Sequence, residues 1–288
     1  MKLSGILNPV RFTWLGGSSP GGERVAVSQR SASLFADPEN PPLLVHCCYH
    51  KAGTHWMKGI LNRLCERHDM TLERIQHSDL FGEGYKSIRP ELLEHDVLLD
   101  GHSRIDLSEL PRFRGSHMIR DPRDMTVSGY FYHLWAREKW LHVAKPKFGN
   151  RTYQQQLNSL NREDGLIQEV ERFAGSFRQM ADWNYNHPDM FELRYETLLI
   201  DDGTLYRQLF SHYGFNEAGI RAGLRIAEKS RFEARAKRNV GKVQEGSVMR
   251  SGKPGQWQEH FTPRVRDRFK ELAGDVLVRL GYESDHNW

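Results

Sequence analysis

Residues 43–61 read LLVHCCYHKAGTHWMKGIL, and the rest of the chain is organised around this stretch. The apolar run at residues 43–48 predicts a buried strand, and the helical spacing that follows predicts a helix beginning at Thr54. A glycine such as Gly53 lets the backbone approach a ligand closely, and the first N–H groups of a helix lack partners within it. With Lys51 beside them, these groups predict a binding site for a phosphate or a sulfate.

The composition is that of a soluble globular protein. The 288 residues are 38% hydrophobic and have a mean hydropathy of −0.67, so the chain can bury a sizeable core. The 41 basic residues nearly balance the 37 acidic ones and leave a net charge of +4. This balance argues against a nucleic-acid partner or a membrane-surface protein, but it is compatible with a local anion site.

The cysteines and the N-terminal segment indicate the compartment. Cys47, Cys48 and Cys65 have neither the spacing of a zinc site nor the pattern of a disulfide framework, so we expect a reducing environment. The N-terminal segment has no apolar run long enough for a secretion signal or a membrane span. We therefore expect a cytoplasmic protein without a membrane span.

The hydrophobic pattern predicts one α/β domain. Residues 1–40 are rich in glycine, serine and proline and are expected to form a partly ordered extension, with order beginning at Leu43 and a single domain over residues 41–288. Further strands are predicted at residues 96–100, 116–119 and 190–193, and helices at 54–68, from Pro122 onward, and at 165–183, 203–213, 217–228 and 263–280. This alternation predicts a mostly parallel central sheet covered by helices on both faces. Residues 136–163 lack a clear period and are expected to form a lid or binding loop.

Polar side chains follow several of the predicted strands. Lys51, His102 and Arg120 come directly after three of them, and Tyr195 comes after the fourth. Because ligands of such sheets bind at the carboxyl ends of the strands, we expect these side chains to converge on one site. The usual P-loop spacing is absent, since Lys51 precedes Gly53, and an ordinary ATPase is therefore disfavoured.

Three motifs resemble the signatures of sulfotransferases that use 3'-phosphoadenosine-5'-phosphosulfate (PAPS). Residues 49–56, YHKAGTHW, are similar to the family's Tyr-Pro-Lys-Ser-Gly-Thr-Thr-Trp motif. Residues 119–130, IRDPRDMTVSGY, resemble its second signature, and residues 250–257, RSGKPGQW, its third. The motifs stand in the family's order over residues 43–280, which is far more specific than any one of them. The resemblance implies a three-layer sandwich with a P-loop-like PAPS site.

The resemblance also implies roles for individual residues. His102 would be the general base for an acceptor that attacks sulfur in line, and Lys51 would stabilise the charge that grows on the leaving group. The cofactor-binding residues implied are Lys51, Ala52, Gly53, Thr54, His55, Trp56, Arg120, Ser128, Tyr195, Ser230, Phe232, Arg250, Ser251 and Gly252. Arg123 and Asp124 are expected to lock the motif loop. The family's transfer needs no metal, and its product is adenosine 3',5'-bisphosphate (PAP).

The chain departs from the family pattern at two places. Ala52 and His55 replace a serine and a threonine of the first motif, so one hydroxyl contact to the cofactor is lost or replaced by an imidazole. The family's dimerisation signature would fall on Gln258, Thr262 and Asp267, where its chemistry has changed. We therefore expect a monomer, or a dimer that does not use this signature.

Several alternatives stay open at the level of sequence. The acceptor hydroxyl or amine could belong to a small molecule, a saccharide or a lipid, and its pocket is expected between residues 135–153 and the loop after Phe81. Taken alone, His102 could be an ordinary surface histidine, and the basic tract at residues 229–242 could be a solvated face or a flap over the nucleotide. A non-catalytic module that binds the bisphosphate nucleotide is one alternative function. A nucleotide kinase is weaker, because Ala52 stands where a metal-holding hydroxyl is needed.

Overall fold

The computed structural model describes residues 32–76, 79–82 and 86–288. Its centre is a five-stranded sheet with strand order β2-β5-β1-β6-β7, and every neighbouring pair in it is parallel. The strands are β1 (Leu43–Cys48), β2 (Leu72–Arg74), β5 (Val97–Asp100), β6 (Phe113–Ile119) and β7 (Met190–Arg194). A separate antiparallel hairpin joins β3 (Leu80–Phe81) to β4 (Ser87–Ile88). The predicted parallel sheet is confirmed, whereas the sequence reading did not identify β2 or the hairpin.

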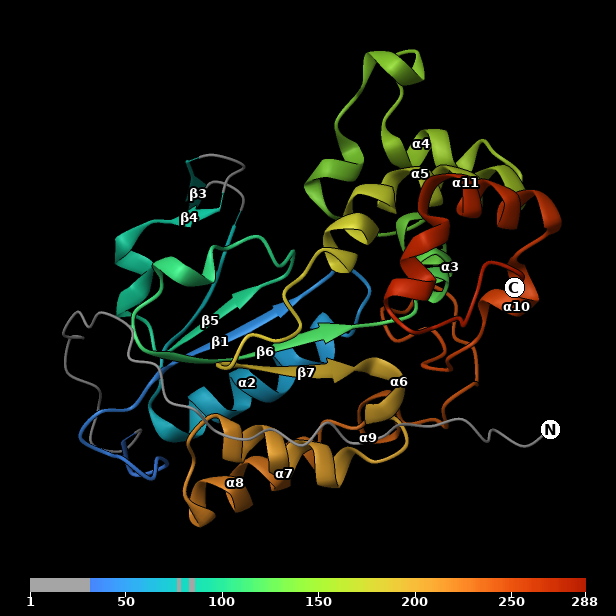
Figure 1. Cartoon of the computed structure of the whole chain (residues 1–288). Coiled ribbons are helices and arrows are strands. Elements are labelled where there is room, and N and C mark those ends of the chain that lie inside the picture. The colour runs from blue at the N-terminus through green and yellow to red at the C-terminus, as the bar shows by residue number, and fades with distance from the viewer. Residues whose placement is uncertain (1–31, 77–78, 83–85) are drawn as a thin grey trace.

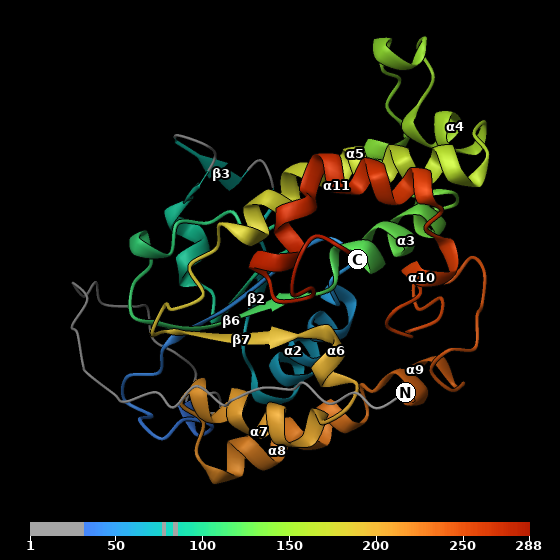
Figure 2. The ribbon, with the colours of Figure 1, turned by 45° about the vertical axis from the view of Figure 1, so that its right-hand side comes forward.

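Helices cover both faces of this sheet (Figures 1 and 2). One face packs against α2 (Thr54–His68), α7 (Asp202–His212) and α8 (Glu217–Glu228), and the other carries α3 (Pro122–His133), α5 (Arg162–Ala181) and α11 (Pro263–Arg279). β1 lies at the centre, and all six of its residues are buried. A strand buried on both faces explains the unbroken apolar run of the sequence. Cys47 and Cys48 pack within it, as expected.

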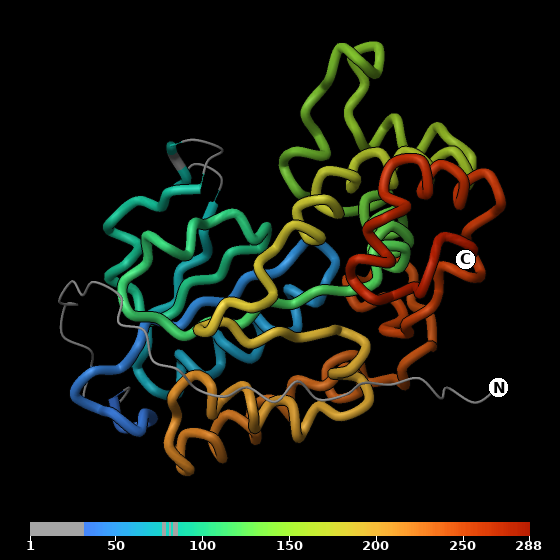
Figure 3. Tube along the Cα trace, viewed as in Figure 1, coloured from blue at the N-terminus to red at the C-terminus, as the bar shows by residue number. Residues whose placement is uncertain are grey.

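Short elements connect these layers. They are η3 (Pro90–Glu94), η4 (Leu107–Glu109), η5 (Lys139–His142), η6 (Pro146–Phe148), α4 (Tyr153–Asn158), α6 (Tyr195–Leu198), α9 (Phe232–Ala236) and α10 (Trp257–His260). The segment without a clear period therefore contains η5, η6 and α4, and it projects from the body of the molecule (Figure 3). Leu141 and Leu157 are fully buried at its base, so it has a packed root.

The last helix differs from its predicted pattern. The apolar stripe of a straight helix through Val265, Phe269 and Val276 would include Leu272, but the backbone at Ala273 leaves the helical region with a φ of −152°. The kink turns the second half of the helix, so that Ala273 and Leu277 are buried while Leu272 is only half-buried. A straight helical wheel cannot anticipate such a change of register.

The packed part of the chain begins before Leu43, where the sequence indicated the start of order. Leu34 and Phe35 are 3% and 2% exposed, and the ring of Phe35 packs edge-on against Phe215 at a centroid distance of 5.0 Å. The predicted extension at residues 1–40 otherwise lies mostly outside the described residues. Within the described part of the chain, no helix is both long enough and apolar enough to cross a bilayer.

Candidate active site

A cavity of about 340 Å³ lies at the carboxyl edge of the sheet. The predicted residues that line it are Lys51, Gly53, Thr54, His55, Trp56, His102, Arg120, Ser128, Tyr195, Ser230, Phe232, Arg250, Ser251 and Gly252. They come from the turn after β1, the loop after β5, the end of β6 with α3, the end of β7, and the chain between α8 and α10. The structure thus brings together residues that are up to two hundred positions apart.

Ala52 is the exception among the predicted residues. Its side chain is fully buried in the core and does not line the cavity. Its backbone N–H donates to the carbonyl of Tyr49 at 2.9 Å, which closes the turn. Ala52 therefore differs from the other predicted residues, because its one backbone donor is already used within the loop.

The turn that follows β1 forms part of the cavity wall. Gly53 has a φ of 101°, and a Cβ there would lie 2.6 Å from the sulfur of Met118, so this position requires glycine. The Lys51 Nζ lies 3.7 Å from the centroid of the Tyr132 ring. Burial, and next the charge of Arg120, lower the pKa of Lys51 to about 7. Among the described residues, no carboxylate lies within ion-pair distance of Lys51.

Arg120 is a second buried cation on this wall. Its guanidinium donates to the carbonyl of Lys51 at 3.2 Å, lies 4.4 Å from the centroid of the Tyr195 ring, and is 3.9 Å from Asp124. Its Nε is buried without a hydrogen-bond partner. Since a buried donor is rarely left unsatisfied, this arrangement fits an anionic ligand that would complete the site.

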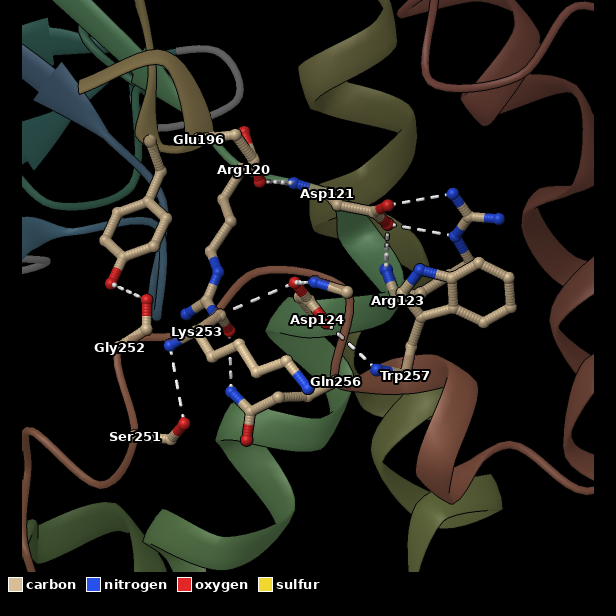
Figure 4. A network of polar contacts seen from close by, with 12 residues as sticks. Arg120, Asp121, Arg123, Asp124, Glu196, Ser251, Gly252, Lys253, Gln256 and Trp257 are labelled. Carbon is tan, nitrogen blue, oxygen red and sulfur yellow. Dashed lines mark hydrogen bonds and ion pairs between the residues drawn. The ribbon is translucent and has the colours of Figure 1, made fainter. Parts of the chain in front are cut away.

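The second and third motifs are tied together beneath Arg120 (Figure 4). Asp124 accepts hydrogen bonds from the backbone N–H groups of Gly255 at 2.6 Å and Trp257 at 3.0 Å. Arg123 donates to Asp121, and its guanidinium lies 3.8 Å from the centroid of the Trp257 ring. Arg123 and Asp124 do not line the cavity. They lock the loop, as predicted, and so fix its position against α3.

Further donors and aromatic side chains lie around the loop of the third motif, residues 250–257. The hydroxyl of Tyr195 donates to the carbonyl of Gly252 at 3.2 Å. Gly252 has a φ of 70°, and a Cβ there would lie 2.7 Å from the Phe232 ring. Arg250 donates to Gln256 at 2.7 Å. Guanidinium, hydroxyl and aromatic groups of this kind suit a phosphorylated nucleoside.

The two predicted histidines lie on the wall of this cavity. His102 is exposed there, and the turn that carries it is fixed by Asp100, which accepts from the His102 N–H at 2.8 Å. Gln179 of α5 donates to the carbonyls of His102 and Ser103 at 3.1 and 2.6 Å. Desolvation, opposed by Asp100, lowers the pKa of His102, which favours the neutral imidazole. Part of the His55 side chain also reaches the surface, and partial desolvation together with the charge of Lys51 lowers its pKa to about 4.

Sequence reasoning missed several lining residues. They are His50, Arg74, Gly101, Tyr132, Arg235, Val248, Met249 and Gln256. Of the stretch expected to form the acceptor pocket, residues 135–153, only Glu138 lines the cavity among the described residues, and residues 83–85 after Phe81 lie outside them. His50 carried a signal that could have found it, because the family signature has proline at this position.

The described residues contain no group of three or more histidine, cysteine, aspartate or glutamate side chains placed to hold a metal ion. The oxygen and nitrogen donors of the cavity are instead mostly cationic or neutral. The arrangement therefore suits a negatively charged ligand better than a positively charged one.

Comparisons with known proteins identify the family of this chain. A family model described as "Sulfotransferase domain" matches residues 41–281. Human sulfotransferase 2A1 is 22% identical over 265 residues, with 82% of this chain and 84% of the relative covered, and mouse sulfotransferase 2A6 is 23% identical with the same coverage.

Solved structures of similar fold include a mouse sulfotransferase, SULT7A1, complexed with PAP. It covers 85% of this chain and 86% of its own, with 17% identity and a TM-score of 0.47. A retinol dehydratase in complex with retinol and PAP matches with 17% identity, a TM-score of 0.43, and coverage of 83% of this chain and 82% of its own. The match of the family model spans well over half of the chain. The chain belongs to the sulfotransferase family, and it is a PAPS-dependent sulfotransferase.

Proposed function

We propose that this enzyme transfers the sulfuryl group of PAPS to a hydroxyl or an amine of a small acceptor molecule and releases PAP. The observation that carries this proposal is the cavity itself, where Lys51 without an acidic partner and Arg120 with an unsatisfied Nε lie on the same wall as His102. Two anionic groups would satisfy both cations. Membership of the sulfotransferase family supports the same reading.

The turn after β1 and the first turn of α2 would hold the 5'-phosphosulfate. The first turn of α2 leaves the N–H groups of Gly53, Thr54 and His55 without partners in the helix. Lys51 would offset the negative charge that develops on the bridging oxygen as the bond to sulfur breaks. Burial strengthens this effect, because charges interact more strongly where water is excluded.

A second group of residues would hold the adenosine 3'-phosphate. Arg120, Ser128 and Arg250 line the cavity and supply guanidinium and hydroxyl donors of the type that phosphate prefers. Trp56 and Phe232 provide aromatic surface for the adenine, and Ser230 lies beside them on the cavity wall. Ser251 and Gly252 add backbone that Tyr195 holds in place.

His102 would take the proton of the acceptor as its oxygen or nitrogen attacks sulfur in line. A neutral imidazole on the cavity wall is able to do so. We expect His102→Ala to lower turnover about a hundredfold while the Kd for PAP changes less than threefold, because the ring has no place in nucleotide binding. Turnover is measured with radiolabelled sulfate and PAP affinity by calorimetry. Wild-type turnover in this variant would remove His102 from the mechanism.

Arg120→Ala tests the nucleotide end. The variant should lose the preference of the wild-type enzyme for PAP over AMP, which lacks the 3'-phosphate, by about ten- to a hundredfold. Calorimetric titration of both nucleotides measures this preference. If binding of PAP and AMP weakened equally, the guanidinium would not be the 3'-phosphate ligand.

Two alternatives are addressed by the same assays. A binding module without catalysis would bind PAP but release no product with any member of a panel of phenols, alcohols, amines and saccharides. A nucleotide kinase would need a hydroxyl after the loop lysine, where the buried methyl group of Ala52 stands.

A further inference from the structure

Three side chains form a hydrogen-bonded chain that ends at the cavity, and the function proposed above does not use it. Nδ1 of His133, the last residue of α3, lies 2.8 Å from Oε1 of Glu169 on α5. Nε2 of His133 lies 2.9 Å from Nε2 of His50. His133 and Glu169 are fully buried, whereas His50 lines the cavity directly before Lys51.

The position of each proton follows from the buried carboxylate. Burial alone would raise the pKa of Glu169, but His133, Arg172 and the hydroxyl of Tyr153, 2.7 Å away, lower it below its usual value. An ionised carboxylate can only accept, so His133 donates from Nδ1 and keeps its lone pair on Nε2. His50 must then donate from Nε2, which leaves Nδ1 as its free base.

Both imidazoles are neutral in this arrangement. Burial lowers the pKa of His133, and burial together with His133, Lys51, Arg172 and His102 lowers the pKa of His50 well below its usual value. The ring planes of His50 and His133 lie 5° apart with their centroids 5.1 Å apart. Nearly coplanar rings at this separation suit a linear hydrogen bond between the two Nε2 atoms.

His50 is a better oriented base than His102. The side-chain hydrogen bonds of the described residues hold the His102 turn by its backbone, through Asp100 and Gln179, and none reaches its ring. The ring of His50 is fixed by a hydrogen bond whose direction Glu169 dictates. The adjacent Lys51 would disfavour a positive charge on His50, whereas the carboxylate of Glu169, at the far end of the hydrogen-bonded chain, can neutralise it.

We propose that His50, His133 and Glu169 form a proton relay that serves the sulfuryl transfer as a second route for the acceptor proton beside His102. The inference rests on the proposed function. As the acceptor oxygen bonds to sulfur, the bridging S–O bond breaks, and its electron pair stays on the departing phosphate. The acceptor proton moves to Nδ1 of His50.

The relay then returns both rings to neutrality. The Nε2 proton of His50 passes to Nε2 of His133, and the Nδ1 proton of His133 passes to Oε1 of Glu169. One proton has entered at the cavity and one resides on the buried carboxyl group, so no second cation stands beside Lys51. His50 touches the acceptor, whereas His133 and Glu169 are positioning residues that act through it.

The test compares two isosteric variants. Glu169→Gln keeps an oxygen that accepts from His133 but cannot take up the proton, so kcat should fall about tenfold or more while the Kd for PAP stays unchanged. Glu192→Gln is the matched control. Glu192 accepts from the buried Nδ1 of His117 at 2.7 Å, but neither residue lines the cavity, and kcat should stay at the wild-type value.

PAP release is measured with PAPS and p-nitrophenol, and in parallel with water as the acceptor, across pH. In Glu169→Gln the acidic limb of the pH profile of kcat should shift, because the proton taken up by His50 can no longer pass to a carboxylate. A merely structural defect would instead lower kcat equally at every pH. Wild-type kcat in Glu169→Gln would overturn the relay. So would a combined loss of PAP affinity and thermal stability in that variant.

Nitrogen NMR of labelled protein provides a readout that needs no turnover. His50 should carry its proton on Nε2 and His133 on Nδ1, and a proton on Nδ1 of His50 would overturn the relay. A wild-type enzyme that neither binds PAP nor releases it would instead contradict the proposed function. The two failures are thus distinguishable.

Discussion

At the scale of single residues, the protonation of Lys51 links nucleotide binding to pH. Burial lowers its pKa to about 7 in the free protein, and an anion beside it would raise that pKa. Binding should therefore take up a proton above pH 7, and PAP affinity should fall as pH rises, by up to about tenfold for each pH unit until the pKa of the complex is passed. Calorimetry in buffers of different ionisation enthalpy measures the proton uptake directly.

Lys51→Arg provides the control for this linkage. A guanidinium stays protonated throughout the accessible pH range, so the variant should bind PAP without taking up a proton. Proton-free binding by the wild-type protein at pH 8 would contradict the low pKa of Lys51.

The sequence predicted most residues of the site, because motifs specify which residues stand beside a strand end. Lys51, His102 and Arg120 follow β1, β5 and β6, and a parallel sheet brings these ends together. Ala52 does not line the cavity, and a motif does not tell which backbone donor closes the turn. His50 was missed although it replaces the family's proline, because its contacts with His133 and Glu169 lie across two helices and cannot be inferred from the motif.

At the scale of elements, glycines in the third motif decide how its loop lies. Gly252 and Gly255 both have left-handed backbones, with φ of 70° and 75°. A Cβ at Gly252 would enter the Phe232 ring, whereas at Gly255 it would meet nothing within 4 Å. Alanine at either position costs about 1–2 kcal/mol because of the left-handed backbone, but only Gly252→Ala also places a Cβ against the Phe232 ring.

Gly252→Ala should therefore weaken PAP binding about tenfold more than Gly255→Ala, since the clash displaces the aromatic surface and the loop of Ser251. Titration of both variants with PAP, together with thermal melting, separates binding from folding. Equal affinities would show that the contact between Gly252 and Phe232 does not shape the nucleotide site.

The prediction of elements succeeded where burial imposes a period. The central strands were recognisable from their apolar runs, and α2 and α8 from their apolar stripes. β2, with its Leu-Glu-Arg sequence, lies at the edge of the sheet and is only partly buried, so it shows no apolar run. The kink at Ala273 depends on tertiary packing, which a helical period cannot register.

At the scale of the whole molecule, the site depends on two layers that meet at the sheet edge. The turn of Lys51 lies between them, because Ala52 packs with α3, α5 and α11 and α2 begins where the turn ends. The layer of α3, α5 and α11 also carries the His133–Glu169 pair. The alternation of strands and helices could predict such a sandwich, but not that residues before Leu43 would belong to one of its layers. Glycine-rich and serine-rich neighbours obscured the two apolar residues there.

Phe35 ties this early segment to the core, and its removal should cost stability. It packs against Phe215, and the adjacent backbone is bonded through Ala36 to Gly214 and through Leu34 to Asn216, each at 2.8 Å. Phe35→Ala should lower the free energy of unfolding by about 3 kcal/mol and the melting temperature by roughly 10 °C. Ile200→Ala, at a position that is 82% exposed, should stay within about 0.5 kcal/mol of the wild type. Should both variants unfold at the same denaturant concentration, residues 32–40 would be an appendage rather than part of the domain, because a side chain buried in a shared core cannot be truncated without loss.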